Sequence, residues 1–125
     1  MTTAGLQTIN WDDVELETVN PNMQRRIVTG EKMTVARIYL KDGFLVPLHS
    51  HENEQITQVI SGRMRFAFGD DRTEVMELGP GDVVVIPSNL PHEALAIVDV
   101  EGSAILQFQP NTTGLARRSP GQYFI

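Results

Sequence analysis

Turn-forming residues recur at short intervals along this chain, and this spacing constrains the fold more than any other feature of the sequence. The turn-forming clusters fall at residues 20–22, 30, 41–43, 61–62, 69–71, 79–82, 87–89, 101–102 and 110–111. Between them lie runs of about five to eight residues that are rich in Val, Ile, Thr and Phe. The rhythm therefore predicts an all-β sandwich or barrel.

Two segments show the alternation of side chains that is typical of strands. In segment 63–68, Met64, Phe66 and Phe68 share one face, and both arginines lie on the other. Segment 33–40 is apolar on both faces except at Arg37, so we expect both faces to be covered. A second sheet would cover one face and a partner subunit the other, which predicts a homodimer.

The chain has 125 residues, which is enough for one domain with its own core. We expect an N-terminal arm over residues 1–19, a β-barrel over residues 20–110 and a C-terminal tail over residues 111–125. Within the arm, residues 11–14 are predicted to form one helical turn that is capped by Asn10.

Composition argues against several classes of protein. The net charge is −6, which disfavours binding to nucleic acid and to anionic membranes, so we expect neither as a partner. The chain has no cysteine, which rules out disulfides, thiol nucleophiles and thiolate metal sites. The longest apolar runs are too short to span a membrane and the N-terminus is unlike a secretory signal, so we expect a cytoplasmic protein.

All the histidines of the chain, His49, His51 and His92, fall in one pattern. Residues two apart on a strand point the same way, so His49 and His51 can direct both imidazoles at one point. Gln55 shares their parity, and His92 opens a later run that a closed sheet could bring opposite them. Glu54 is the alternative fourth ligand, although strand parity directs its side chain away from the histidines.

Three neutral imidazoles and one carbonyl oxygen form a site for a divalent transition metal, here Fe, Mn, Ni, Zn, Co or Cu. A Gln ligand adds no charge, so a bound ion would keep its full double charge and attract an anionic substrate. The alternative interpretation is that the histidines lie at the surface or make hydrogen bonds in the core.

The segment that carries the first two histidines resembles the first sequence motif of the cupin superfamily. Gly43, His49, His51 and Gly62 stand at the positions of the family pattern. Gln55 stands where the family usually has Glu, with the same spacing to the final Gly. The resemblance thus assigns the fourth ligand position to Gln55.

The segment that carries the third histidine resembles the second cupin motif. Gly81, Pro87 and His92 match it, and Asn89 replaces a Gly at a turn where Asn can adopt a positive φ. The two motifs together imply a double-stranded β-helix, that is, a jelly-roll barrel of about six to ten strands in one domain, with metal bound inside.

The run His-Ser-His-x-x-x-Gln and segment 24–30 are similar to the cupins of pectin degradation, and some cupins with this run use Gln as a ligand. That family opens unsaturated uronate rings, a reaction that needs general acid–base catalysis. Those relatives carry Asp-x-Phe-x-Pro on a late strand. Here Phe108 and Pro110 match, but Leu106 replaces the Asp, which argues against the uronate reaction.

Strand parity also predicts which side chains surround the ligands. The small or polar residues expected on the ligand face are Thr57, Val59, Ser61, Ala94, Ala96 and Val98. An inward arginine could hold a substrate carboxylate through two hydrogen bonds. The candidates for contact with a substrate are Arg26, Arg37, Tyr39 and Phe108, and the sequence identifies no catalytic residue.

These observations favour a metalloenzyme with one divalent ion, of the isomerase, lyase or dioxygenase type. Its substrate would be a small polar or anionic molecule, such as a sugar acid or a keto or enol compound. The alternatives are a non-catalytic module that binds or senses a small ligand, and a structural or storage protein.

Overall fold

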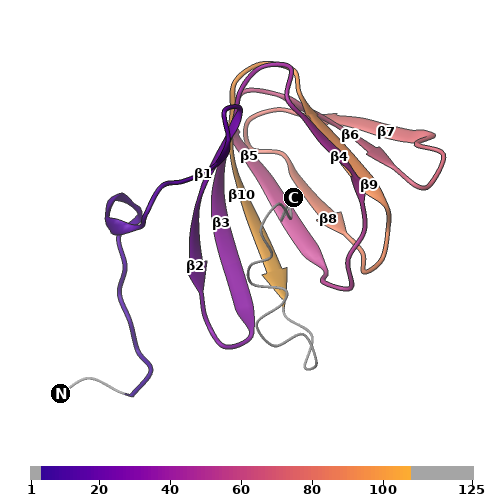
Figure 1. The fold of residues 1–125 in the computed structure, drawn as a ribbon. Coiled ribbons are helices and arrows are strands. Elements are labelled where there is room, and N and C mark those ends of the chain that lie inside the picture. Colours follow the sequence, from indigo (N-terminus) through magenta and orange to yellow (C-terminus); the bar gives the residue numbers. More distant parts are fainter. Residues whose placement is uncertain (1–3, 108–125) are drawn as a thin grey trace.

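The computed structural model describes residues 4–107, and within them the chain forms two antiparallel sheets that face each other (Figure 1). The first has six strands in the order β1-β2-β3-β10-β5-β8, and the second has four in the order β4-β9-β6-β7. The strands are β1 (Glu17–Asn20), β2 (Met23–Thr29), β3 (Met33–Leu40), β4 (Leu45–His49), β5 (Gln55–Ser61), β6 (Met64–Phe68), β7 (Glu74–Leu78), β8 (Val83–Ile86), β9 (His92–Ala96) and β10 (Val100–Gln107). This arrangement confirms the predicted all-β double-sheet barrel.

Strand β10 holds the six-stranded sheet together, because it pairs with β3 on one side and with β5 on the other. Those two strands are far from β10 in the sequence, so the barrel closes through long-range contacts. In the second sheet β9 lies between β4 and β6 in the same way. Each of the two histidine segments thereby reaches the same end of the barrel.

The core fills the space between the sheets. Phe66, Val46 and Ala94 enter it from the four-stranded sheet, and each is fully buried. Val59 and Ala104 enter it from the six-stranded sheet and are buried to the same extent. Burial alternates along the strands, since each second side chain faces the partner sheet and removes apolar surface from water.

The segments that the alternation identified as strands are strands. In β3 the even-numbered residues from Thr34 to Leu40 are buried, and in β6 Met64, Phe66 and Phe68 face the core. The predicted helical turn is also present, as the 3-10 helix η1 (Trp11–Asp13). Its cap is the one predicted, because the side chain of Asn10 accepts a hydrogen bond from the backbone N–H of Asp12 at 2.8 Å.

Two turns depend on backbone conformations with positive φ. Gly62 has φ +85°, and a Cβ there would lie 2.1 Å from the backbone oxygen of Asp99. Only glycine fits so close to another backbone segment. Asn89 has φ +65°, so the turn tolerates Asn in place of Gly, as the sequence predicts.

Two of the residues expected to face the ligands do not. The pairing of β10 with β5 shifts register between Glu101 and Gly102, and beyond this bulge Ser61 is exposed. Val98 follows the end of β9 and is 46% exposed. Parity fails at both positions, because it holds only while a strand remains regular.

Strand β1 begins at Glu17, so the last residues of segment 1–19 pair with β2 as part of the sheet. Among residues 4–107, no helix has the length and apolar character needed to cross a membrane.

Candidate metal centre

The three histidines meet at one end of the barrel. His49 is the last residue of β4 and His92 the first residue of β9, and the two are direct partners across these strands. His51 lies in the connection that leads from β4 to β5. His49 and His92 are 43 positions apart in the sequence, and they become neighbours because β4 pairs with β9.

The imidazoles are close enough to share one ion. One nitrogen from each ring lies within 4.8 Å of one nitrogen from each of the others. The ring centroids are 4.3 Å apart for His49 and His92, 5.1 Å for His51 and His92, and 5.6 Å for His49 and His51. His92 is buried and the other two rings are partly buried. The cluster could therefore hold a metal ion.

The backbone fixes which nitrogen of each ring faces the cluster. Nδ1 of His49 lies 2.8 Å from the carbonyl oxygen of Pro47, and Nδ1 of His92 lies 2.8 Å from that of Leu90. Nδ1 of His51 is 2.9 Å from the carbonyl oxygen of the residue two positions later. A carbonyl oxygen only accepts, so each Nδ1–H donates. The neutral rings consequently carry their lone pairs on Nε2, the form in which imidazole binds a metal.

Gln55 joins the histidines from the other sheet. It is the first residue of β5, it is fully buried, and its backbone neighbours are Ile86 and Leu106. Its Oε1 lies 3.1 Å from Nε2 of His51. The four candidate ligands named from the sequence are therefore together. Glu54, the alternative, is exposed.

Hydrogen bonds hold the segment from His51 to Gln55 against the turn between β8 and β9 and against the end of β10. The side chain of Asn53, which is 6% exposed, donates from Nδ2 to the backbone oxygen of Gln107 at 2.9 Å. The backbone N–H of Asn89 donates to the oxygen of His51 at 2.7 Å. The turn before β9 and the end of β10 thus position the two ligands that follow β4.

The walls beside the cluster are apolar or small. Ala94 and Ala96 continue from His92 on the inner face of β9, and both are fully buried, as predicted. Leu106 is 2% exposed and lies beside Gln55 on β10. Leu106 stands where the pectin-degradation cupins carry an acid. A hydrocarbon side chain therefore lies beside the candidate ligand Gln55.

Arg26, Arg37 and Tyr39 lie on the outer face of the six-stranded sheet, because the residues that alternate with them face the core. Arg26 donates to the hydroxyl of Tyr39 at 2.9 Å. Arg37 forms an ion pair with Glu101 and stands 5.6 Å from the centre of the Trp11 ring. A role of these three residues in substrate contact stays a prediction, and it would concern the outer face. Phe108 lies outside the described residues.

Among residues 4–107, the arginine that is buried on the inner face is Arg25, which is not one of the candidates for substrate contact. It shares the inner face of β2 with Met23 and is 3% exposed. Its Nε and Nη2 donate to the two carboxylate oxygens of Glu17 on β1, each at 3.1 Å. The strand parity that Arg25 shares with the apolar Met23 does not decide the face by itself, because the partner Glu17 lies on another strand.

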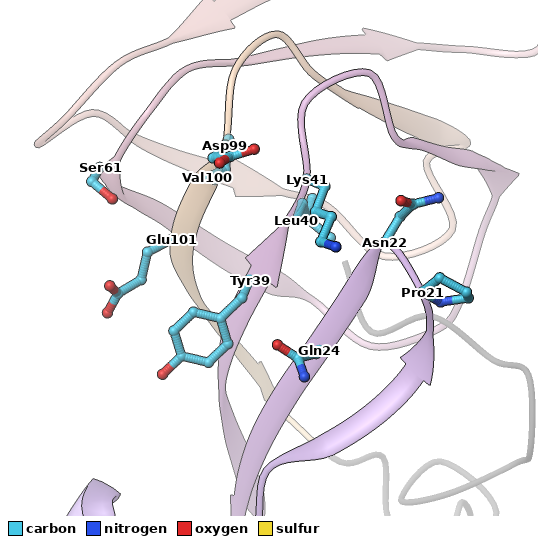
Figure 2. Close-up of a pocket in the computed structure, with 10 residues that line it drawn as sticks. All are labelled: Pro21, Asn22, Gln24, Tyr39, Leu40, Lys41, Ser61, Asp99, Val100 and Glu101. Atoms are coloured by element: carbon cyan, nitrogen blue, oxygen red, sulfur yellow. The ribbon is translucent and has the colours of Figure 1, made fainter.

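A separate open groove of about 270 Å³ lies on the outer face, near the end of β3 and the start of β10. Figure 2 shows Tyr39, Gln24 and Glu101 projecting beside it. None of the candidate metal ligands lines this groove. A convergent set of ligand atoms is a stronger sign of a chemical site than an open groove, so the histidine cluster is the candidate site.

Comparison with known proteins agrees with this geometry. The Cupin family profile matches residues 4–121. A germin-like protein from Ipomoea nil is 33% identical over 97 residues, which cover 75% of this chain and 42% of that protein, so the chain spans less than half of that relative.

Solved structures resemble the fold. KdgF from Halomonas sp. has a TM-score of 0.71 at 25% identity, with 80% of this chain and 93% of that chain covered. An RmlC-like cupin from Shewanella frigidimarina has a TM-score of 0.72 at 16% identity, with 80% and 88% covered. A variant of Bacillus subtilis oxalate decarboxylase has a TM-score of 0.75 at 23% identity, with 94% and 36% covered. Profile, relative and fold agree: the chain belongs to the cupin family.

Proposed function

We propose that this cupin binds one divalent transition metal through His49, His51, His92 and Gln55. On this basis we also propose that it is a metal-dependent enzyme for a small polar or anionic substrate. The observation that carries the proposal is the cluster of three imidazole nitrogens within 4.8 Å of one another, with the amide oxygen of Gln55 3.1 Å from Nε2 of His51. The backbone hydrogen bonds to all three Nδ1 atoms support it, since they leave Nε2 as the ligand atom.

The charge of the proposed ligand set favours an anion as the substrate. All four side chains are neutral when they bind, so the double charge of the ion is not reduced by its ligands. A carboxylate or a similar oxygen anion would neutralise part of this charge in a partly enclosed space. The overall charge of −6 does not oppose this, because the local field at the ion dominates.

A divalent ion would supply Lewis acidity, which polarises an oxygen of a bound substrate. The residues of this chain have other tasks. Ala94 and Leu106 are buried and put small and apolar side chains beside His92 and Gln55. The histidine Nδ1 protons stay bound to backbone oxygens, so the rings hold their orientation. Isomerase, lyase and dioxygenase chemistry are the classes that this arrangement suits.

The second candidate function is ligand binding without turnover. The specific observation in its favour is Leu106, because no carboxylic acid stands at this place beside Gln55 to transfer a proton. A module that binds or senses a small anion would use the same ion and the same neutral ligands.

Metal binding is tested first on the protein stripped of metal. Isothermal titration with Zn²⁺ or Mn²⁺ should give one site per chain, and His92→Ala should weaken binding by at least about a hundredfold, because it removes a direct ligand. Glu93→Gln is the matched control, since Glu93 is adjacent in sequence but accepts a hydrogen bond from Arg72 at 3.0 Å. Equal binding by the wild type and His92→Ala would overturn the proposed site.

Catalysis is tested on the loaded protein with sugar acids, keto acids and enols. Turnover of any of these compounds that is lost in His92→Ala supports the enzyme. Saturable binding of an anion with no turnover of any compound would support the binding module instead.

We further propose that the chain forms a homodimer through the outer face of the six-stranded sheet. Ile56, Ile60, Val83 and Val85 on β5 and β8 are 38 to 56% exposed there, and Ile56 pairs with Val85, so exposed apolar side chains lie side by side on this face. Light scattering at micromolar concentration should give twice the mass of the chain. A monomer under these conditions would refute the dimer.

A further inference from the structure

The side chain of Gln55 has two chemically different ends, and each has its own neighbour. Oε1 lies 3.1 Å from Nε2 of His51, and the amide Nε2 donates to Oγ1 of Thr57 at 2.8 Å. Gln55 is fully buried and Thr57 is 2% exposed, so water does not substitute for either contact. Both residues are on the inner face of β5, two positions apart.

The contact between Gln55 and His51 lacks a hydrogen when the ring is neutral. Nδ1 of His51 already donates to the backbone oxygen of Asn53, so Nε2 presents a lone pair. Oε1 of Gln55 also presents lone pairs. Two acceptors at 3.1 Å are unfavourable by themselves, but a cation that both of them bind makes the same arrangement favourable.

The hydroxyl of Thr57 accepts from the amide N–H₂ in this orientation, and a bound cation decides between this orientation and the reverse one. If the amide turned over, its N–H₂ would donate to His51 and its oxygen would lie towards Thr57. A threonine hydroxyl can accept from the amide in the first orientation and donate to it in the second. Only the first directs an oxygen at the histidines.

We propose that Thr57 is a positioning residue for the metal centre, which acts by accepting from the amide N–H₂ of Gln55 while Oε1 faces His51 in the histidine cluster. The inference rests on the proposed metal site and adds a residue to it. It also explains how a neutral Gln can serve as a ligand inside the barrel. Unlike a carboxylate, the amide carries N–H groups that need an acceptor when buried, and Thr57 provides one.

Two substitutions separate this role from packing. Thr57→Val keeps the branched shape of the side chain and removes the hydroxyl, which leaves a buried amide N–H without its acceptor. Thr57→Ser keeps the hydroxyl and removes a methyl group. In titrations with Zn²⁺, Thr57→Val should bind about tenfold more weakly than the wild type, and Thr57→Ser should stay within about twofold to threefold.

A purely structural role predicts the opposite order, because Val fills the space of Thr and Ser does not. A double-mutant cycle tests the route of the effect. In a Gln55→Ala background, Thr57→Val should no longer change the affinity for Zn²⁺, since the amide that it positions is absent.

The orientation itself can be followed by NMR without any activity assay. The side-chain N–H₂ signals of Gln55 in ¹⁵N-labelled protein should shift on addition of Zn²⁺ in the wild type and in Thr57→Ser. If Zn²⁺ binds the wild type and Thr57→Val equally well, the positioning role is wrong and the metal site stands. If Zn²⁺ does not bind the wild type, the proposed function fails together with this inference.

Discussion

Replacing Gln55 by Glu tests whether this side chain binds the metal. The two side chains have nearly the same shape, so the substitution changes charge with little change in packing. The replaced atom lies 2.8 Å from Oγ1 of Thr57, whose hydroxyl can turn round and donate to a carboxylate. The local structure can therefore accept the substitution, and the effect on metal binding is mainly electrostatic.

The magnitude follows from two opposing terms. At about 4 Å and an effective dielectric constant of about 20, a carboxylate and a divalent ion attract each other by about 8 kcal/mol. The desolvation of a buried carboxylate offsets several kcal/mol of this attraction. Gln55 is fully buried, so a carboxylate at this position avoids the penalty in the metal-free protein by binding a proton, and release of this proton on metal binding uses part of the attraction. Since about 1.4 kcal/mol corresponds to a factor of ten, we expect metal affinity to rise at least tenfold.

The assay is isothermal titration with Zn²⁺, together with thermal unfolding of both forms. Gln55→Glu should lower the unfolding temperature of the metal-free protein. It should also increase the difference in unfolding temperature between the metal-free and the metal-loaded protein. Glu54→Gln is the control, because Glu54 is adjacent, exposed and the alternative ligand. If Gln55→Glu leaves the affinity unchanged while Glu54→Gln lowers it, Gln55 is not the ligand and Glu54 takes its place.

Three further predictions concern the scaffold. Gly62→Ala should destabilise the fold by about 2–5 kcal/mol in urea unfolding, whereas Gly81→Ala, at a similar positive φ but with open space around its Cβ, should cost only about 1–2 kcal/mol; equal costs would contradict the steric explanation. Phe66→Ala should cost about 3–5 kcal/mol, because it leaves a cavity at a fully buried position, and a loss below about 1 kcal/mol would mean that the core is packed differently. Hydrogen bonding to Arg65 lowers the pKa of the exposed Glu77 carboxyl, so this carboxylate adds stability above its ordinary pKa and loses it as pH falls. Glu77→Gln should therefore lower the unfolding temperature slightly at neutral pH and much less in acid, and a deficit that grows in acid would contradict the sign.

Local patterns were sufficient to predict the strands at 33–40 and 63–68, and they named the candidate ligands His49, His51 and His92. The alternation at 33–40 and 63–68 identifies inner faces because one face of each strand must leave water. The spacing of His49 and His51 limits where their rings can point. The meeting of His49 with His92, however, depends on the pairing of β4 with β9, which a fold resemblance implies and single-strand patterns do not contain.

Other features could not be predicted, because they depend on irregular or long-range structure. The bulge that exposes Ser61 arises where the pairing register of β10 with β5 shifts, and the sequence of β5 alone does not indicate this shift. Arg25 faces inward because Glu17 on a neighbouring strand compensates its charge. Without knowledge of β1, an arginine among mixed neighbours is equally compatible with either face. The hydrogen bond from Gln55 to Thr57 likewise becomes visible only when rotamers are known.

The candidate ligands are divided between the two layers of the barrel, since His49 and His92 belong to one sheet and Gln55 to the other. An ion bound here would link the two layers at the end of the barrel where the histidines lie. Loading would then slow amide hydrogen exchange in both layers at once, including strands that contribute no ligand atom. Loss of the ion would remove this link between the two sheets. Metal occupancy and the separation of the sheets at this end would therefore change together.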